Sequence, residues 1–390
     1  MRCCKPRLTR CLTFCLTLSL LCLWCVAAFS LPAEAAASAP LKRRPHVVMF
    51  TPRADGFWSL FAQIAQAAAR DLDIELEWIP ALNDAKKQLN DAMQVLNRSE
   101  LPDLLLYKNF DGTAVPILKA AEAKKVYSIL FEEALTAAES REYGVPREHF
   151  KYWLGEFLPD NLEAGFDLLN ALAALARKEG RKDANGKIHL LALGGNMDEG
   201  SSTERITGLQ IALKKHPDII LHEIAAGFWK ESVARSKMRR LLPLYPQTHI
   251  IWTANDTMPV GAYLAAKDLG LIRPLIGGVG TTPPGAMDVL EGKVDVSVGG
   301  NFLIGAFCLV LVRDFFSGKD FASESAVMRL SMFTFYPNNV KNYAEALSGN
   351  NWDQVDFRTF SRTLNPTLKK YPFGFQPILK QLSRGYLPNK

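Results

Sequence analysis

Cysteine is nearly absent from the chain beyond residue 25. Six of the seven cysteines lie among the first 25 residues, and the seventh is Cys308. A single cysteine cannot form an internal disulfide, so the fold that follows must be held together by its hydrophobic core. Roughly 350 residues remain after the N-terminal segment, which is enough for two domains of ordinary size.

A second long apolar run is also lacking. The nearest candidate, residues 302–316, is interrupted by Arg313 and Asp314, so we expect no membrane span there. At the N-terminus, by contrast, four basic residues precede the apolar stretch 11–29, and small residues with Ala-x-Ala spacing follow it. This order is typical of a cleaved signal peptide, here over residues 1–37, with an uncleaved membrane anchor as the alternative.

Strong charge and the common catalytic and metal-binding patterns are missing too. Without four leader cations and Glu34, the formal net charge falls from +6 to +3, which argues against a nucleic-acid partner. The six histidines form no pair at metal-ligand spacing, although His189, His222 and His249 fall in three expected strands. No phosphate-binding loop or Gly-x-Ser-x-Gly motif is present. We therefore expect no catalytic residues, no metal and no cofactor.

What the sequence has is a regular alternation of strands and helices. Short β-rich runs, from residues 46–50 to residues 328–335, are separated by segments with the i, i+3, i+4 spacing of amphipathic helices. Continuous apolar strands that alternate with helices predict an α/β fold whose parallel sheets are covered on both faces. Ligands bind such sheets at the carboxyl ends of the strands, so the loops there should hold the site.

Several residues in these loops are candidates for ligand contact. Phe57 lies on the apolar stripe of the first helix, so core packing and ligand contact are both open for it. Trp58 lies off that stripe and is expected to form a wall of the site. Arg205 follows a capping-box pattern, Ser201-x-x-Glu204, in a first helical turn where a cation is unfavourable unless it has a use. Asp256 is expected to cap the next helix.

Three stretches of the chain resemble the type I periplasmic binding proteins, especially the ribose- and galactose-binding group. Residues 50–58, FTPRADGFW, are similar to the family's first strand and loop. Residues 253–262, TANDTMPVGA, resemble its Asn-Asp-x-x-Ala-x-Gly-Ala turn, and residues 277–283, GGVGTTP, resemble the start of its last βαβ unit. The resemblance covers about residues 45–336.

The resemblance implies two Rossmann-like lobes with parallel sheets, joined by a hinge of three crossovers. The N-terminal lobe would take residues 45–157, completed by about 301–335, and the C-terminal lobe would take residues 158–300. Crossings are then expected near residues 157–158, 300–301 and 335–336. Residues 336–390 would form a C-terminal extension, which we expect to pack on the surface as a tail.

A cleft between the lobes would bind a small polar ligand, a sugar or a sugar-like molecule. The ligand-binding residues implied by the resemblance, together with the aromatic candidates, are Asp55, Phe57, Trp58, Glu132, Arg205, Asn255 and Asn301. Two departures leave the ligand open. The run Val279-Gly280-Thr281-Thr282 stands where the family has a sugar-binding aspartate, and Glu132-Glu133 replaces an Asp-Arg pair. The branch similar to the autoinducer-2 receptor also lacks the aspartate, so a signalling ligand remains an alternative.

The resemblance and the leader together predict a monomeric protein of the periplasm that binds and releases a ligand and catalyses nothing. Two partners are open. The closed protein would deliver its ligand to an inner-membrane ABC permease, or it would dock on a membrane sensor kinase or cyclase. Both uses depend on closure of two lobes around a ligand by a hinge.

Overall fold

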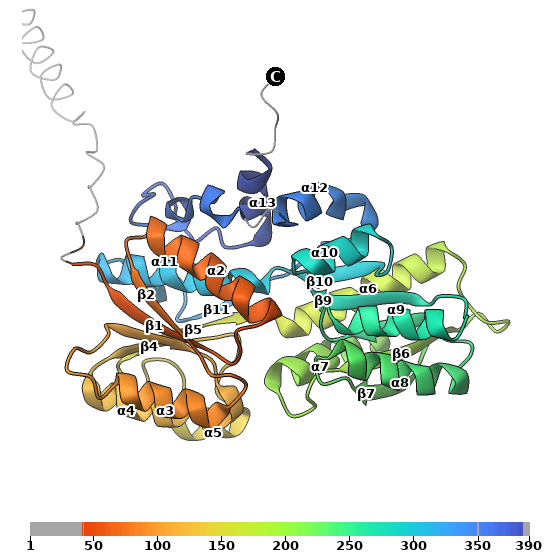
Figure 1. The fold of residues 1–390 in the computed structure, drawn as a ribbon, viewed down its shortest axis with the longest axis horizontal. Helices are drawn as coiled ribbons and strands as arrows, with labels where there is room; N and C mark the ends of the chain where they lie inside the picture. Colours follow the sequence, from red (N-terminus) through yellow and green to blue (C-terminus); the bar gives the residue numbers. More distant parts are fainter. Residues whose placement is uncertain (1–40, 42, 349–350, 385–390) are drawn as a thin grey trace, which may run out of the picture. The chain divides into compact units, whose positions relative to one another are not determined.

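Two six-stranded sheets organise the chain, and each is covered by helices (Figure 1). The computed structural model describes residues 41 and 43–384 except 349–350, so the expected signal peptide, residues 1–37, lies outside the described residues. This architecture confirms the predicted α/β fold with two lobes built on sheets of parallel strands.

The first sheet defines the N-terminal lobe. Its strand order is β11-β5-β4-β3-β1-β2, and every neighbouring pair is parallel. The strands are β1 (His46–Thr51), β2 (Glu75–Pro80), β3 (Leu104–Tyr107), β4 (Tyr127–Phe131), β5 (Trp153–Pro159) and β11 (Val327–Leu330). Five helices accompany them: α2 (Gly56–Asp71), α3 (Ala85–Val95), α4 (Ala114–Lys124), α5 (Ala137–Tyr143) and α11 (Ile304–Phe316).

Side-chain alternation along the strands explains why both faces of this sheet are covered. Val47 and Met49 of β1 pack into the cluster that contains α2 and α11, whereas Val48 and Phe50 pack into the cluster that contains α3 and α4. Successive strand residues point to opposite faces, so a strand that is apolar throughout needs a helical layer on each side. Cys308 is fully buried in α11.

The second sheet defines the C-terminal lobe, with the order β12-β10-β9-β8-β6-β7. The strands are β6 (Ile188–Gly194), β7 (Ile219–Ala226), β8 (Ile250–Thr253), β9 (Leu275–Gly280), β10 (Val296–Gly299) and β12 (Phe333–Phe335). The helices are α6 (Asn161–Lys178), α7 (Gly200–Lys215), α8 (Glu231–Leu244), α9 (Met258–Asp268) and α10 (Pro283–Leu290). All strand pairs are parallel except β10 with β12.

The chain passes between the sheets three times. The first passage follows Pro159, and the second is at Gly300, whose φ of 117° suits glycine. The expected single strand over residues 328–335 is wrong: β11 pairs with β5 of the first sheet, and β12 pairs antiparallel with β10 of the second. The third passage therefore lies at Ser331 and Met332 and not at residues 335–336. The sequence pattern over residues 328–335 indicates strand but not which of the two sheets each part of the run joins.

The C-terminal extension corrects the expectation of a surface tail. It forms α12 (Pro337–Ser348), the short 3₁₀ turns η4 (Trp352–Gln354) and η5 (Phe357–Phe360), and α13 (Phe375–Arg384). Its aromatic side chains complete the core against α2 and α11, and α12 lies on α10 of the other lobe (Figure 1). Within α11 the buried Asp314 carboxylate accepts hydrogen bonds from the backbone N–H groups of Arg362 and Thr363. The extension thus contacts both lobes.

The expected helix starts are partly right. The Asp160 side chain caps α6 by accepting a hydrogen bond from the Glu163 N–H group, as predicted. The Ser201–Glu204 capping box is wrong, because α7 begins at Gly200, two residues earlier than a Ser201 cap requires. The Ser202 hydroxyl accepts a hydrogen bond from the Gly195 N–H group. Of the helices in the described part of the chain, none has the length and apolarity needed to span a membrane.

Candidate functional site

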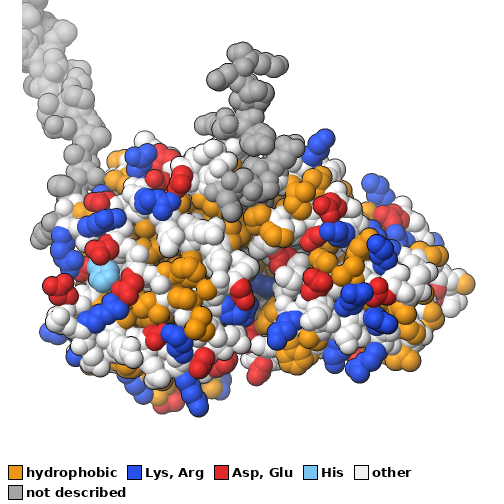
Figure 2. Space-filling model, viewed as in Figure 1, with side chains coloured by type: hydrophobic (Ala, Val, Ile, Leu, Met, Phe, Trp, Pro, Cys, Tyr) orange, Lys and Arg blue, Asp and Glu red, His pale blue; other side chains and the backbone are white. Residues whose placement is uncertain are grey.

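A cleft of about 1420 Å³ lies between the lobes at the carboxyl ends of the strands. Most closed small-molecule sites enclose about 300–1,000 Å³, so this space holds a small ligand and leaves room for the lobes to move closer. Figure 2 shows the furrow between the lobes, with acidic and basic side chains along its edges. Seven residues singled out in the sequence line it, namely Asp55, Phe57, Trp58, Glu132, Arg205, Asn255 and Asn301.

Arg205 is a fixed hydrogen-bond donor on the C-terminal side of the cleft. Its Nε donates to the Asn161 Oδ1 at 2.8 Å, and its Nη1 donates to the Ala254 carbonyl at 2.6 Å. The residue is 6% exposed, and Nη2 donates to none of the described residues. Two hydrogen bonds therefore hold the guanidinium in place while its remaining edge is available to a ligand.

Glu132 and Asn301 form the base of the cleft on the N-terminal side. Both are buried, and the Asn301 Nδ2 donates to the Glu132 Oε2 at 3.1 Å. The Asn301 Oδ1 is buried without a hydrogen-bond partner among the described residues. Burial raises the pKa of Glu132 to about 7, against the opposing effects of Arg205, Asn301 and Lys108. The pair therefore leaves an acceptor that is unused until a donor enters the cleft.

The raised pKa of Glu132 predicts how stability depends on pH. An acid with a higher pKa in the folded than in the unfolded state stabilises the fold fully below pH 4.5 and loses that contribution as the pH rises to about 7. We expect Glu132 alone to lower the free energy of unfolding by about 3 kcal/mol across this window. Glu132→Gln keeps an acceptor for Asn301 and cannot ionise, so its stability should be less sensitive to pH.

Urea unfolding of the ligand-free protein at several pH values measures this effect. The curves of wild type and Glu132→Gln should coincide near pH 4.5 and separate towards pH 8, with the variant more stable. Glu156 is a second buried acid with which the titration of Glu132 can be compared, because burial also raises the pKa of Glu156 to about 7 and Glu156 does not line the cleft. Parallel curves for wild type and Glu132→Gln would show that Glu132 does not titrate in this range.

The aromatic pair at the start of α2 differs from the expectation. Trp58 is 7% exposed and packs in the core against Phe61 and Phe131, at ring-centroid distances of 5.4 and 6.3 Å. Phe57 is only half-buried and meets the Trp58 ring edge-on. The first turn of α2 lies over the end of β4, so a side chain off the apolar stripe is still covered. Both residues line the cleft, but Trp58 is a core residue as well.

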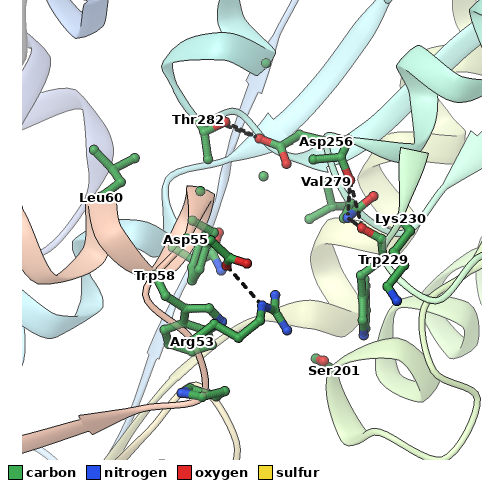
Figure 3. A pocket seen from close by; sticks show the side chains of 18 of the residues that line it. Arg53, Asp55, Trp58, Leu60, Ser201, Trp229, Lys230, Asp256, Val279 and Thr282 are labelled. Atoms are coloured by element: carbon green, nitrogen blue, oxygen red, sulfur yellow. Dashed lines mark hydrogen bonds and ion pairs between the residues drawn. The ribbon is translucent and has the colours of Figure 1, made fainter. Parts of the chain in front are cut away.

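Asp55 lies at the entrance to the cleft. It is exposed at the N-cap position of α2, makes no capping hydrogen bond, and accepts one from the Arg53 Nε at 3.1 Å (Figure 3). This exposed ion pair contributes little to stability, because solvent screens it. Its charged groups are available at the mouth of the cleft on the N-terminal lobe.

The roles expected for Asn255 and Asp256 are exchanged. The Asn255 Oδ1 accepts a hydrogen bond from the Met258 N–H group at 3.0 Å, and its Nδ2 donates to the Trp229 carbonyl and to the Thr257 hydroxyl. Asn255 therefore holds the start of α9, which was the task predicted for Asp256. The Asp256 carboxylate makes no hydrogen bond to α9 and lies in the cleft.

Lys108, which lines the cleft, was missed. It lies directly after β3, is buried and pairs with Glu133 at 2.6 Å. The Glu133 Oε1 accepts a hydrogen bond from the Gly200 N–H group of the other lobe, so Glu133 joins the lobes and does not line the cleft. Its position directly after a strand was the signal that could have identified Lys108.

Trp229 forms the aromatic wall of the C-terminal lobe. Its Nε1 donates to the Glu199 Oε2 at 2.8 Å, and the Arg205 guanidinium lies 5.9 Å from its ring centroid. A Cβ atom on Gly195 would lie 2.0 Å from the indole, so only glycine at that position admits the ring. Phe228 and Trp229 both have positive φ angles, 54° and 61°, which is unusual for aromatic residues and marks a strained loop at the rim.

The histidines lie away from the cleft. His189 and His222 stack with ring centroids 5.0 Å apart, and His249 accepts a hydrogen bond from the His189 N–H group. They cluster near the amino ends of β6 and β8, opposite the cleft edge. In the part of the chain that the structure describes, no group of three or more His, Cys, Asp or Glu side chains is arranged to hold a metal ion.

Comparisons with known proteins give the chain its family. The model of the periplasmic binding protein domain matches residues 47–320. A ribose import binding protein of Salmonella typhimurium is 24% identical over 274 residues, which are 70% of this chain and 84% of that protein. A xylitol-binding protein of Mycolicibacterium smegmatis is 24% identical over 237 residues, 60% of this chain and 59% of that protein.

A solved structure resembles nearly the whole described chain. A periplasmic sugar-binding protein from Pseudomonas fluorescens is 30% identical, with a TM-score of 0.76, and the match covers 86% of this chain and 99% of that one. The Actinobacillus succinogenes solute-binding protein solved with D-allose is 19% identical with a TM-score of 0.68, a likeness that concerns the fold alone. With the family model, the two lobes and the cleft in agreement, this chain belongs to the type I periplasmic binding proteins.

Proposed function

We propose that this protein captures a sugar or a sugar-like polyol in the cleft between its lobes and delivers it to an inner-membrane ABC permease. The observation that carries the proposal is the combination of aromatic walls and fixed polar groups in one cleft. Trp58 and Trp229 line it from opposite lobes, and Arg205, Glu132 and Asn301 are held by hydrogen bonds within the protein. Aromatic faces suit the C–H faces of a sugar, and pre-positioned donors and acceptors suit its hydroxyl groups.

The relatives support this ligand class. The names of the two curated relatives state that one binds xylitol and the other takes part in ribose import. Both ligands are small, neutral and rich in hydroxyl groups. We take binding without catalysis as the activity, since the named relatives are binding proteins and no histidine or cysteine is among the described residues that line the cleft.

Export to the periplasm is part of the proposal. It rests on the family and on the basic, apolar and Ala-x-Ala order of the first 37 residues. N-terminal sequencing of the protein extracted from the periplasm should give a first residue between Ala36 and Pro40. Recovery of the full-length chain in the membrane fraction alone would contradict cleavage.

Ligand-induced closure is the measurable outcome. We expect D-ribose, D-allose, D-galactose or xylitol to raise the melting temperature in proportion to the logarithm of its concentration, because the ligand binds only the folded protein. At saturation, small-angle scattering should show a smaller radius of gyration as the lobes close. If no member of this panel changes the melting temperature, the protein is not a binder of these sugars. A raised melting temperature with an unchanged scattering profile would exclude a hinged closure.

A further inference from the structure

The residues directly after β9, Thr281 and Thr282, bring no acidic side chain to the C-terminal wall of the cleft. Thr281 is fully buried, with its hydroxyl hydrogen-bonded to the Ser297 hydroxyl at 2.6 Å. It does not line the cleft. The neighbouring Asn255 already accepts a hydrogen bond at its Oδ1 from the Met258 N–H group. Neither residue therefore presents a free acceptor to the cleft.

Asp256 lies in this wall and is built into it. Its Oδ2 accepts hydrogen bonds from the Thr282 N–H group, at 3.0 Å, and from the Thr282 hydroxyl (Figure 3). Its Oδ1 accepts no hydrogen bond from the described residues. The residue is half-buried and lines the cleft. One carboxylate oxygen is thus anchored, and the other is left for a donor in the cleft.

Two glycines make the space for this carboxylate. A Cβ atom on Gly280 would lie 2.8 Å from the Asp256 Cγ, and one on Gly285 would lie 2.9 Å from its Oδ2. Gly280 also has a φ of 148°, which other residues rarely adopt. A side chain at either position would displace the carboxylate. The space beside these two glycines therefore fits the Asp256 side chain.

The opposite wall presents a second carboxylate. Glu132 of the N-terminal lobe and Asp256 of the C-terminal lobe both interact electrostatically with the Arg205 guanidinium. An ionised carboxylate only accepts hydrogen bonds, so a ligand beside Asp256 must donate to it. Glu132, whose pKa burial raises to about 7, is partly protonated near neutral pH and can then donate as well as accept. The hydroxyl groups of a neutral polyol suit both carboxyl groups. A sugar acid would place a negative charge beside the Asp256 carboxylate, which is unfavourable.

We propose that Asp256 is a specificity-determining ligand residue, which supplies the free acceptor of the C-terminal wall and selects neutral polyhydroxylated ligands over sugar acids. This inference rests on the proposed function, since it concerns the same cleft.

The test compares two variants with a matched control. Asp256→Asn keeps an oxygen for Thr282 but exchanges the free acceptor for a donor, and Gly285→Ala displaces the carboxylate without altering it. Asp268→Asn, at the other end of α9, removes an equal charge from an exposed pair with Arg235 and should leave binding unchanged. Affinities are measured by calorimetric titration with D-ribose, D-allose, D-galactose, xylitol and the corresponding sugar acids.

We expect the wild type to prefer a neutral member of the panel, and Asp256→Asn and Gly285→Ala to bind it about 10- to 100-fold more weakly, with Asp268→Asn unaffected. Binding of that ligand by Asp256→Asn within threefold of the wild type would overturn the role of Asp256 and leave the proposed function standing. Preference of the wild type for a sugar acid would overturn the selectivity. Binding of no panel member would overturn the proposed function and this inference together.

Discussion

Replacing Arg205 with alanine is expected to weaken ligand binding about 100-fold or more, equivalent to about 3 kcal/mol. Its guanidinium is held by Asn161 and by the Ala254 carbonyl, so its free edge is already oriented before a ligand arrives. Without the Arg205 guanidinium, the ligand oxygens lose a fixed hydrogen-bond donor. The Glu132 and Asp256 carboxylates also lose the cation with which both interact. Calorimetric titration with the tightest-binding panel sugar measures the loss.

Two companion variants separate binding from folding. Arg205→Lys keeps a positive charge, but lysine cannot hydrogen-bond Asn161, the Ala254 carbonyl and a ligand at the same time. We therefore expect this variant to lose much of its ligand affinity and little of its free energy of unfolding. Arg177→Ala removes an exposed arginine, paired with Asp218 in the same lobe, and should change neither property by much. If Arg205→Ala binds the sugar within threefold of the wild type, the arginine serves only to join α7 to its neighbours.

Phe375→Ala is expected to destabilise the protein by about 3–5 kcal/mol, the usual range for removal of a buried phenylalanine. Phe375 begins α13 in the C-terminal extension and is 3% exposed. Its ring meets Phe302 and Phe335 edge-on, and a Cβ atom on Gly300 would lie 3.3 Å from it. The ring therefore fills the space beside the second passage between the lobes, at Gly300. Urea or thermal unfolding measures the effect.

The neighbouring Gln376 provides the matched control. It is exposed in the same helix, so Gln376→Ala should leave the free energy of unfolding nearly unchanged. If Phe375→Ala costs less than about 1 kcal/mol, the extension is a loosely attached tail after all. A large loss for both variants would instead indicate that α13 itself is disrupted.

The fold was predictable from sequence because its signals are local. Strands such as β1 carry a continuous apolar run, here Val47 to Phe50, which requires helices on both faces of the sheet, and the order of elements follows directly. The errors arose where the outcome depends on contacts distant in sequence. Residues 328–335 read as one strand, yet two sheets divide them. The aromatic residues after Tyr336 have no regular spacing, so nothing in the pattern indicated that α2 and α11 need them as a cover.

The candidate site was predictable in position but less so in detail. The resemblance to the family, together with the rule that ligands bind beyond the carboxyl ends of parallel strands, named seven residues that line one cleft. It could not decide which of two adjacent polar residues caps a helix and which is left free. Asn255 and Asp256 differ only by a carboxylate and an amide, and the choice depends on Thr282, Gly280 and Gly285, which come from another loop. The burial of Trp58 likewise depends on the end of β4.

The C-terminal extension also has a consequence for the order in which the lobes fold. The fully buried residues of the C-terminal core all lie between residues 164 and 298, one continuous stretch of chain, and only Met332 and Tyr336 join its edge from further along. The core around α2 and α11 combines residues 47–157 with residues 286–382, so its contacts close loops of more than a hundred residues. Long loops add to the entropic cost of closure and slow the formation of contacts. The N-terminal lobe is therefore synthesised first but completes its core last. Its apolar strands stay exposed until the end of the chain has been made.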